Sequence, residues 1–366
     1  MTALFAVIAP CPPIDALEQE WRLLEAEADP SVFLSWAWIG THIDAFGPPS
    51  FLARVIRGDK TVGLALLGRR VAGLIGWPRR PSLHLNETGD PGRDGVMIEY
   101  NGVLTRDDPI ETADAVLRAV LSKDAPFWRE LHLGGVSCDW IEHCRRLGLT
   151  VRLQRQPQTA PFAALDCSGV DDPLVSLSRN TRQQLRRSLR WFERRGALAI
   201  RAAESADQAV AWLDDLEELH SASWRVRNKS GAFAAPDFSV FHRALIKRAF
   251  AEGVPDVLRV SAGTQVIGYL YNFVWREWAY SYQSGLRYED DPDCRPGLVA
   301  HLLALRRYHA GGLRGYRFLA GNSRYKASFA NGDDQLFWLV VHRSDWGHRL
   351  EDWGRRLRRA LPSFRL

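Results

Sequence analysis

The sequence predicts an α/β (α+β) protein built from two successive units of similar style. With 366 residues the chain is longer than a typical single domain, and its 46% apolar content is enough to fill large cores. Strongly β-prone runs alternate with segments of helical apolar periodicity along both halves. The segment 155–172 mixes proline, glycine and aspartate and is typical of a crossing between domains. We therefore expect an N-terminal domain at residues 1–160 and a C-terminal domain at residues 161–366.

The first residues, MTALFAVIAPCPP, are typical of an opening β-strand. No basic residue precedes the short apolar run and proline follows it, which argues against a secretory signal peptide. No run approaches the ~20 apolar residues of a membrane span. The five cysteines form no C-x-x-C pair and no zinc-type spacing with histidine, so we expect reduced thiols and no metal site. These features predict a soluble, cytoplasmic protein without a transmembrane segment.

Apolar periodicity predicts the remaining elements of the first half. Ile110, Ala113 and Val116 share one face of a helix, and Gly58-Asp59 forms a turn between two strand-like runs. Helices are predicted at residues 14–28, 37–46, 109–122 and 140–147, and strands at 51–57, 61–68, 130–133, 150–154 and 161–166.

The region 76–102 is loop-rich, and long ordered loops are often functional. It is either a loop on the surface or the edge of a site for an acceptor substrate, to which Asn86, Glu87 or Asp90 would contribute. The sequence leaves both interpretations open.

From residue 197 onward the predicted order is strand, helix, helix, strand, hairpin, helix, strand, short helix, strand. The hairpin joins residues 265–275 to residues 278–285 through Arg276 and Glu277. Its first run is apolar on both faces, which predicts a central strand. One face is expected to hold Ile267, Tyr269, Tyr271, Phe273 and Trp275, and the other Val266, Leu270 and Val274.

The start of the next helix is typical of a phosphate site. Pro296 and Gly297 precede an apolar stripe formed by Leu298, Leu302 and Leu305. A Pro-Gly start leaves the first backbone N–H groups free, and these groups with the helix dipole attract an anion. Arg295 would add a charge-assisted hydrogen bond. The alternative is that Pro296 and Gly297 form an ordinary junction between a loop and a helix and bind no phosphate.

Two helices carry many arginines. The first, at residues 177–195, has seven of them and an apolar face marked by Leu185, Leu189 and Phe192. It is either a solvated basic face or a contact for RNA, an anionic glycan or the 3′-phosphate of coenzyme A, with Arg182 and Arg186 as the candidate contacts. The second lies in the C-terminal stretch and is either packed on its domain or interfacial with a membrane. Its apolar stripe is formed by Trp346, Leu350, Trp353, Leu357 and Leu361.

Several chemistries leave no motif in the sequence. It contains no G-x-x-x-x-G-K-[ST] loop, no G-x-S-x-G elbow, no H-E-x-x-H and no G-x-G-x-x-G after a strand. Nucleotide hydrolysis by a P-loop, serine hydrolysis, zinc proteolysis and dinucleotide redox chemistry are therefore disfavoured. Cys294 lies near the predicted phosphate site, but a small buried thiol is the simpler interpretation.

The element order, the hairpin, Arg295-Pro296-Gly297 and the pair Tyr325-Lys326 resemble the GNAT acyltransferase superfamily. More narrowly, the chain resembles the branch of cellulose-biosynthesis (CelD-like) acetyltransferases, which is related to the Fem-type aminoacyl transferases. The N-terminal residues Trp21, Phe33, Trp36 and Trp38 and the basic helix support this branch. The resemblance implies tandem GNAT-like folds, each a mixed, mostly antiparallel sheet flanked by helices. The glycine-rich phosphate loop of the superfamily is reduced here to Arg295, Pro296 and Gly297.

The resemblance implies a GNAT acyltransferase that uses acetyl-CoA or another acyl-CoA. The acceptor would be an amine or hydroxyl of a small molecule, a sugar or an envelope-polysaccharide precursor. Direct attack on the thioester needs backbone N–H groups for the oxyanion and an acid for the thiolate, but no covalent enzyme intermediate. The alternatives are an aminoacyl-tRNA-dependent transferase and a catalytically silent binding scaffold.

Candidate residues follow for each role. The catalytic candidates are Tyr325, His220 and Tyr282. The candidates for cofactor binding are Arg295, Pro296, Gly297, Leu298, Val299, Tyr269, Leu270 and Tyr271. The candidates for substrate binding are Trp224, Arg225, Lys229, Gln283, Asn322 and Lys326. Each has a plainer structural interpretation as well, such as a packed helical histidine or a solvated lysine.

Overall fold

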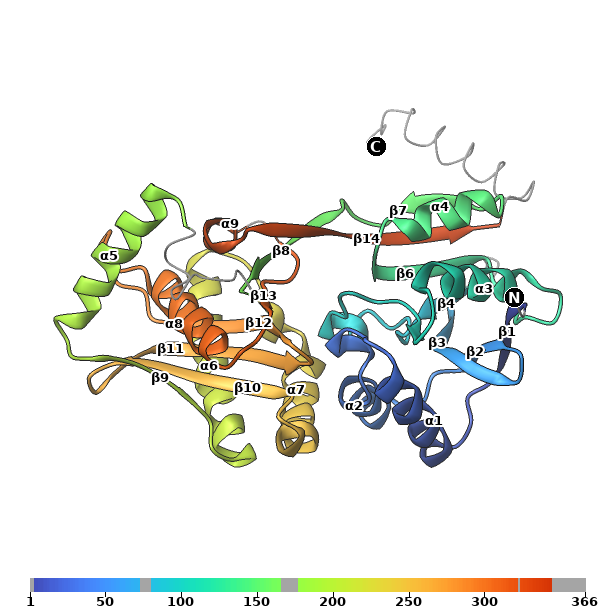
Figure 1. Cartoon of the computed structure of the whole chain (residues 1–366), viewed down its shortest axis with the longest axis horizontal. Coiled ribbons are helices and arrows are strands. Elements are labelled where there is room, and N and C mark those ends of the chain that lie inside the picture. The colour runs from blue at the N-terminus through green and yellow to red at the C-terminus, as the bar shows by residue number, and fades with distance from the viewer. Residues whose placement is uncertain (1–2, 73–79, 166–176, 322, 344–366) are drawn as a thin grey trace, which may run out of the picture.

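The computed structural model describes residues 3–72, 80–165, 177–321 and 323–343, and it is an α/β structure. Figure 1 shows two lobes side by side, each with a sheet and its own helices, joined by one long strand near the C-terminus. The strands form a continuous sheet in the order β1-β2-β3-β4-β6-β14-β8-β13-β12-β11-β10-β9. Most neighbouring strands are antiparallel. No helix among the described residues is both long and apolar enough to cross a membrane.

The N-terminal lobe holds the first seven strands and four helices. Two of these helices, α2 and α3, begin at side-chain caps: Ser35 accepts a hydrogen bond from the N–H of Trp38, and Asp108 accepts from the N–H of Ile110. The elements are β1 (Leu4–Pro10), α1 (Ile14–Glu27), α2 (Trp36–Phe46), β2 (Phe51–Arg57), β3 (Lys60–Ala72), β4 (Arg80–Leu85), β5 (Leu104–Thr105), α3 (Pro109–Leu121), β6 (Glu130–Val136), α4 (Asp139–Arg146) and β7 (Thr150–Leu153), with short 3-10 turns η1 (Val32–Leu34) and η2 (Arg93–Val96).

The C-terminal lobe follows the predicted order of elements from residue 197 onward. Its elements are β8 (Gln158–Ala164), α5 (Arg179–Glu193), β9 (Leu198–Ala202), α6 (Ala206–Val226), η3 (Ala232–Ala234), α7 (Pro236–Ala249), η4 (Phe250–Glu252), β10 (Pro255–Ala262), β11 (Gln265–Trp275), β12 (Trp278–Leu286), α8 (Pro296–Ala310), β13 (Gly315–Arg317), α9 (Arg324–Phe329) and β14 (Gly332–His342).

Strand β14 belongs to both lobes. Its first part, Gly332 to Leu336, pairs with β8 of the C-terminal lobe. Its second part, from Phe337 to His342, pairs with β6, and the end of the same stretch also pairs with β7. Figure 1 shows this strand as the bridge between the lobes. The lobes therefore share one sheet, although each lobe has its own set of helices.

The largest core lies where the lobes meet. Helices α2 and α7 pack together there. The ring of Trp38 on α2 lies 4.9 Å from that of Phe241 on α7 and 5.8 Å from that of Phe273 on β11. Tryptophan 38 is only 1% exposed. A continuous aromatic core thus joins the N-terminal helices to the face of β11 that carries Tyr269, Tyr271 and Phe273.

Two expectations need correction. The alternation predicted for β11 fails at its start, because a bulge between Val260 and Ser261 of β10 leaves Ile267 unpaired. One extra residue moves the preceding side chains to the opposite face. Ile267 therefore packs in the cluster of Leu270, whereas Val266 packs in that of Tyr269.

The loop-rich region 76–102 also contains a strand that the sequence did not indicate. Strand β4 pairs antiparallel with β3 and parallel with β6, so its residues are covered on both sides. Pro81 at its second position obscured the pattern. The expected C-terminal helix, with Trp346 to Leu361, lies outside the described residues.

Candidate active site

The sheet of the C-terminal lobe splits between β12 and β13. The two strands are parallel and pair only from Trp278 to Tyr280 on β12. Beyond that point β12 continues to Leu286, while the chain after β13 turns away at Phe318. Strand β12 also has a bulge at Tyr282, which is skipped in the register with β11. Alternate backbone N–H and C=O groups of β12 after Ser281 thus face an open gap instead of a neighbouring strand.

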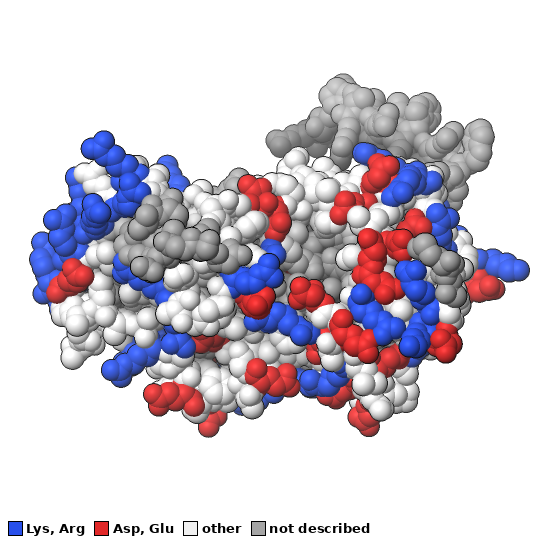
Figure 2. All heavy atoms as spheres, viewed as in Figure 1, with Lys and Arg blue, Asp and Glu red and all other residues white. Residues whose placement is uncertain are grey.

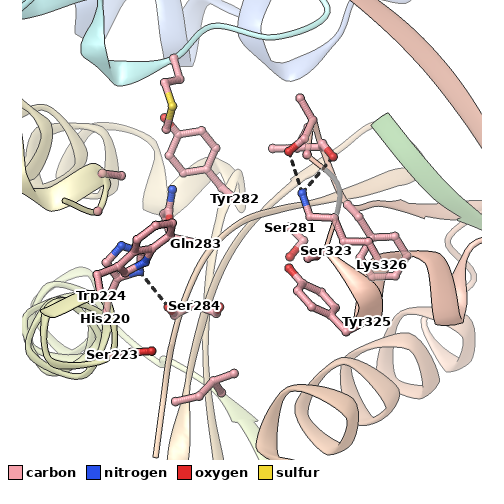
Figure 3. A pocket seen from close by; sticks show the side chains of 18 of the residues that line it. His220, Ser223, Trp224, Ser281, Tyr282, Gln283, Ser284, Ser323, Tyr325 and Lys326 are labelled. Atoms are coloured by element: carbon pink, nitrogen blue, oxygen red, sulfur yellow. Dashed lines mark hydrogen bonds between the residues drawn. The ribbon is translucent and has the colours of Figure 1, made fainter. Parts of the chain in front are cut away.

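A cavity of about 670 Å³ occupies this gap. In Figure 3, His220 and Trp224 of α6 form one wall, Tyr325 and Lys326 of α9 form the opposite wall, and β12 lies between them. The N-terminal lobe contributes Met97 and Glu99, and the crossing between the lobes contributes Arg155 and Gln158. The other lining residues are Ser223, Arg227, Ser230, Gly231, Ala232, Ser281, Tyr282, Gln283, Ser284, Leu286, Tyr288, Phe318, Leu319, Ala320, Gly321 and Ser323.

His220 is held with one ring nitrogen on β12. Its Nδ1 lies 3.1 Å from the carbonyl oxygen of Ser284, which can only accept, so Nδ1 carries the proton. Burial lowers the pKa of His220, so the ring is neutral near pH 7 and Nε2 keeps its lone pair. This Nε2 has no hydrogen-bond partner among the described residues. A Cβ on Gly231 would lie 2.4 Å from it, so only glycine fits beside the ring.

Tyr325 lies on the opposite wall with its ring stacked on His301 of α8. Figure 3 shows its hydroxyl directed from α9 toward Ser281 of β12. Burial raises the pKa of Tyr325 to about 12, so the hydroxyl keeps its proton at neutral pH. A protonated hydroxyl at the split of the strands is a hydrogen-bond donor for a ligand in the cavity.

Lys326 and Glu99 fix the turn that follows β13. The ammonium of Lys326 donates to the carbonyl oxygens of Leu319 and Ala320 at 3.0 and 2.8 Å. The carboxylate of Glu99 accepts from the N–H of Ala320 at 2.7 Å. Burial lowers the pKa of Lys326 to about 8 and raises that of Glu99. The turn needs this support because Leu319 has a φ of +61°, which is strained for a side chain other than glycine.

The predicted catalytic and substrate residues largely meet at this cavity. Tyr325, His220, Tyr282, Trp224, Gln283 and Lys326 all line it. The hydroxyl of Tyr282 donates to the carbonyl of Val96, so this side chain ties β12 to the N-terminal lobe. Arg225 and Lys229 are exposed and are not among the lining residues. Asn322 lies outside the described residues.

The predicted cofactor residues fall into two groups. Tyr269, Leu270 and Tyr271 on β11 are buried behind β12 in the two cores and do not line the cavity. Leu298 and Val299 are buried on α8. Arg295, Pro296 and Gly297 form the start of α8, which adjoins the cavity: a Cβ on Gly297 would lie 3.5 Å from Leu286, a lining residue. The exposed Arg295 side chain donates to Gln184 of α5 at 3.0 Å.

Sequence reasoning missed the four lining residues that precede α5 in the chain, which are Met97, Glu99, Arg155 and Gln158. Met97 and Glu99 lie in the predicted loop-rich region, which was considered as the edge of a site for an acceptor but with other residues in mind. Arg155 and Gln158 lie in the predicted crossing between domains. No local pattern marks them, because the pairing of β14 with both lobes brings these segments to the cavity.

Outside the lining of the cavity, three side chains lie close enough together to hold a metal ion. His84, Glu87 and Asp94 have ligand atoms within 4.8 Å of one another. The carboxylate of Asp94 already accepts hydrogen bonds from the N–H groups of Thr88 and Gly89. Burial raises the pKa of Glu87 to about 8, which favours a neutral carboxylic acid here. The hydrogen bonds of Asp94 hold the loop from residue 88 to residue 94 in place.

The fold and the cavity define an α/β protein with a cavity at the split of its sheet. Residues 179–327 match the family model described as acetyltransferase (GNAT) domain, and most of the residues that line the cavity come from this span. This part of the chain is therefore similar to GNAT acetyltransferase domains. No significant match to the chain was found among curated proteins.

Three solved structures are similar to nearly the whole chain. FemX is 10% identical with a TM-score of 0.59, over 91% of this chain and 96% of that chain. L-PGS from Bacillus licheniformis is 10% identical with a TM-score of 0.53, over 92% and 93%. A conserved protein of unknown function from Bacteroides thetaiotaomicron VPI-5482 is 9% identical with a TM-score of 0.52, over 93% and 100%. At these identities the similarity shows a shared fold over both lobes. The predicted fold class, an α/β protein with a mixed, mostly antiparallel sheet flanked by helices, is confirmed.

Proposed function

We propose that the protein transfers an acyl group from acyl-CoA to an amine or hydroxyl of a small acceptor. The observation that carries the proposal is the cavity at the split between β12 and β13, lined by one neutral histidine and one protonated tyrosine on opposite walls. The GNAT family match to the same part of the chain supports acyl transfer. A sugar or envelope-polysaccharide precursor as acceptor rests on the resemblance alone.

The start of α8 suits the phosphates of coenzyme A. Gly297 leaves room for close approach beside Leu286, and the exposed Arg295 offers a guanidinium next to it. Arg227, whose guanidinium lies 5.8 Å from the rings of both Trp224 and Tyr288, adds a second positive charge at the same end of the cavity. The open backbone edge of β12 after Ser281 would hydrogen-bond an extended amide-bearing arm that lies in the gap.

Acyl-CoA would supply a thioester carbon that an amine can attack directly. The neutral Nε2 of His220 would accept the proton of the attacking amine, and the Nδ1 bond to Ser284 would hold the ring in the required tautomer. The backbone N–H groups at the bulge of β12 would stabilise the oxyanion. The Tyr325 hydroxyl would protonate the leaving thiolate. Because Gly231 covers Nε2, the segment after α6 would move when the acceptor enters.

Transfer from aminoacyl-tRNA is the second candidate, and helix α5 favours it. Its arginines 179, 186, 187, 190 and 194 are exposed. Figure 2 shows them as a dense positive surface at one end of the molecule, where α5 lies in Figure 1. Such a surface suits the phosphate backbone of RNA.

Calorimetric titration of acetyl-CoA into the purified protein tests the first candidate. Wild type should bind, Arg295→Glu should bind at least about tenfold more weakly because a repulsive charge replaces a phosphate contact, and Arg145→Glu on the far lobe should bind normally. Absence of binding to wild type, combined with salt-sensitive tRNA binding that Arg186→Glu and Arg187→Glu abolish, would favour the second candidate.

A further inference from the structure

We propose that Arg155 binds an anionic group, a carboxylate or a phosphate, of the acceptor. The inference deepens the proposed function and rests on it, because it concerns the acceptor of the same cavity. It names the chemical class of the acceptor as an amine or alcohol that carries a negative charge.

The guanidinium of Arg155 is oriented by an aromatic ring. Its Cζ lies 3.5 Å from the ring centroid of Trp338 on β14, close enough for face-on stacking. The backbone before it is also fixed, because the N–H of Gln154 donates to the carbonyl of Trp338 at 2.8 Å. A stacked guanidinium presents the N–H groups on its edge, and it loses little freedom when it binds a ligand.

Arg155 has hydrogen-bonding capacity to spare. Among the described residues, no hydrogen bond or ion pair involves its guanidinium, and its side chain is exposed at the cavity. Partial burial lowers the pKa of Arg155, whereas the nearby carboxylates of Glu99 and Glu87 raise it. Arginine remains charged at neutral pH in either case. The planar fork of donors matches a carboxylate or phosphate in two parallel hydrogen bonds.

The other charged groups nearby are already engaged. The ammonium of Lys326 donates to two carbonyls, and the carboxylate of Glu99 accepts from the N–H of Ala320. Among the described residues that line the cavity near the N-terminal lobe, Arg155 is thus the cation whose N–H donors are free. A guanidinium with free donors at this end favours an anionic ligand.

The two arginines among the described lining residues, Arg155 and Arg227, lie at opposite ends of the cavity. Arg227 lies between Trp224 and Tyr288, beyond the Leu286 end of β12, where the donor phosphates would lie. Arg155 lies with Met97 and Glu99 at the other end, where Tyr282 of β12 is bonded to Val96. The acyl donor would therefore not use Arg155, and the group that approaches from the N-terminal lobe is the acceptor.

Matched pairs of acceptors test the proposal with acetyl-CoA as donor and release of free thiol as readout. Lysine is compared with 1,5-diaminopentane, and phosphoethanolamine with ethanolamine, so that each pair differs by one anionic group. Wild type should favour the anionic member of at least one pair in kcat/KM, and the preferred pair distinguishes carboxylate from phosphate. Arg155→Ala should raise KM for that anionic member by about tenfold or more and should leave KM for the member without the anionic group within about twofold. Arg145→Ala is the matched surface control.

Direct binding separates failure of this inference from failure of the proposed function. Glutarate and inorganic phosphate are titrated calorimetrically into wild type and Arg155→Ala in the absence of donor. Loss of anion binding in the variant supports the site even when acetyl-CoA does not bind wild type and acyl transfer is excluded. If acetyl-CoA binds but neither anion does, and if Arg155→Ala keeps the wild-type preference within each pair, the assignment of Arg155 is overturned. Trp338→Leu should give an intermediate loss, since the guanidinium is then no longer oriented.

Discussion

The ring of Tyr325 stacks on the imidazole of His301, with centroids 4.5 Å apart and planes inclined by only 6°. His301 in turn contacts the hydroxyl of Tyr316 through Nδ1 at 3.0 Å. From Tyr316 a buried polar chain continues through Asn272 and Tyr308 to Asp256, with Tyr308 donating to the carboxylate at 2.8 Å. The proposed acid of the cavity is therefore seated on a rigid, largely buried network, as pre-organised catalytic groups require.

Replacing Tyr325 with Phe tests its role as the acid. The ring and its stacking on His301 remain, so acetyl-CoA should bind with unchanged affinity. We expect kcat to fall by about 10²–10⁴-fold, the usual contribution of a general acid. Steady-state kinetics and calorimetry on the same preparation measure both. Unchanged kcat with weakened binding would show that Tyr325 holds the donor and does not protonate the thiolate.

The pH dependence of kcat/KM tests His220. Burial lowers the pKa of His220 below its ordinary value of 6.5, and a base must be unprotonated to act. As far as His220 is concerned, kcat/KM should therefore not change with pH near pH 7, and it should fall as the pH drops through this lowered pKa. In His220→Gln the acidic limb should disappear and kcat should fall by about 10²–10⁴-fold, whereas His309→Gln at the end of α8 should behave as wild type. An acidic limb that persists in His220→Gln would assign the titration to another group.

Gly231→Ala tests the fit of the loop over His220. Its φ is −89°, so alanine causes no backbone strain, but the new Cβ would lie 2.4 Å from Nε2 of His220. We expect kcat to fall with little change in the free energy of unfolding, because only the ring and the loop move. Gly102→Ala is the control, since nothing lies within 4 Å of its added Cβ. Equal kinetics for the two variants would show that the close packing of Gly231 against His220 does not affect turnover.

Truncation of Trp38 tests how strongly the lobes depend on each other. Its ring contacts Phe33 of the N-terminal lobe and Phe241 and Phe273 of the C-terminal lobe. Trp38→Ala should lower the free energy of unfolding by about 3–5 kcal/mol, as expected for a large buried aromatic side chain. Urea denaturation followed by far-UV circular dichroism measures it. We expect a single transition for wild type, and two separated transitions would contradict the shared core.

Lys326 links stability to alkaline pH. Its pKa is lowered from 10.5 to about 8 in the folded protein, so between these values the unfolded chain binds more protons than the folded one. The contribution of Lys326 to stability should therefore rise with pH over this interval. The difference in unfolding free energy between wild type and Lys326→Met should increase from pH 8 toward pH 10. A difference that is constant or falls would show that the ammonium is not desolvated.

The sequence predicted much of the second half, because its signals are local. The hairpin at Arg276, the helix that begins at Pro296 and the order of elements after residue 197 were all recognised from turn residues and apolar periodicity, and all are confirmed. Tyr325 was recognised through the family resemblance, and His220 was a candidate as a lone histidine near the end of a predicted helix. The structure places both on the cavity, while their catalytic roles stay predictions.

The rest depends on contacts between distant segments, which no local pattern encodes. The bulge that moves Ile267 to the other face of β11 is set by its pairing with β10. Tyr269 and Tyr271 were expected at the ligand, but only the position of β12 in front of them shows that they are core residues. Arg155 and Glu99 reach the cavity across the lobes.

Strand β14 has a consequence for biosynthesis. Its residues 332–342 complete the sheets of both lobes, yet they leave the ribosome after every strand with which they pair. Until they emerge, β6 and β8 each lack a neighbour on that side, and the nascent chain carries two open sheet edges at once. Neither lobe can finish folding ahead of the other, so a nascent chain arrested before residue 332 would be held by chaperones as one unfinished body instead of a finished N-terminal domain with an unfolded tail.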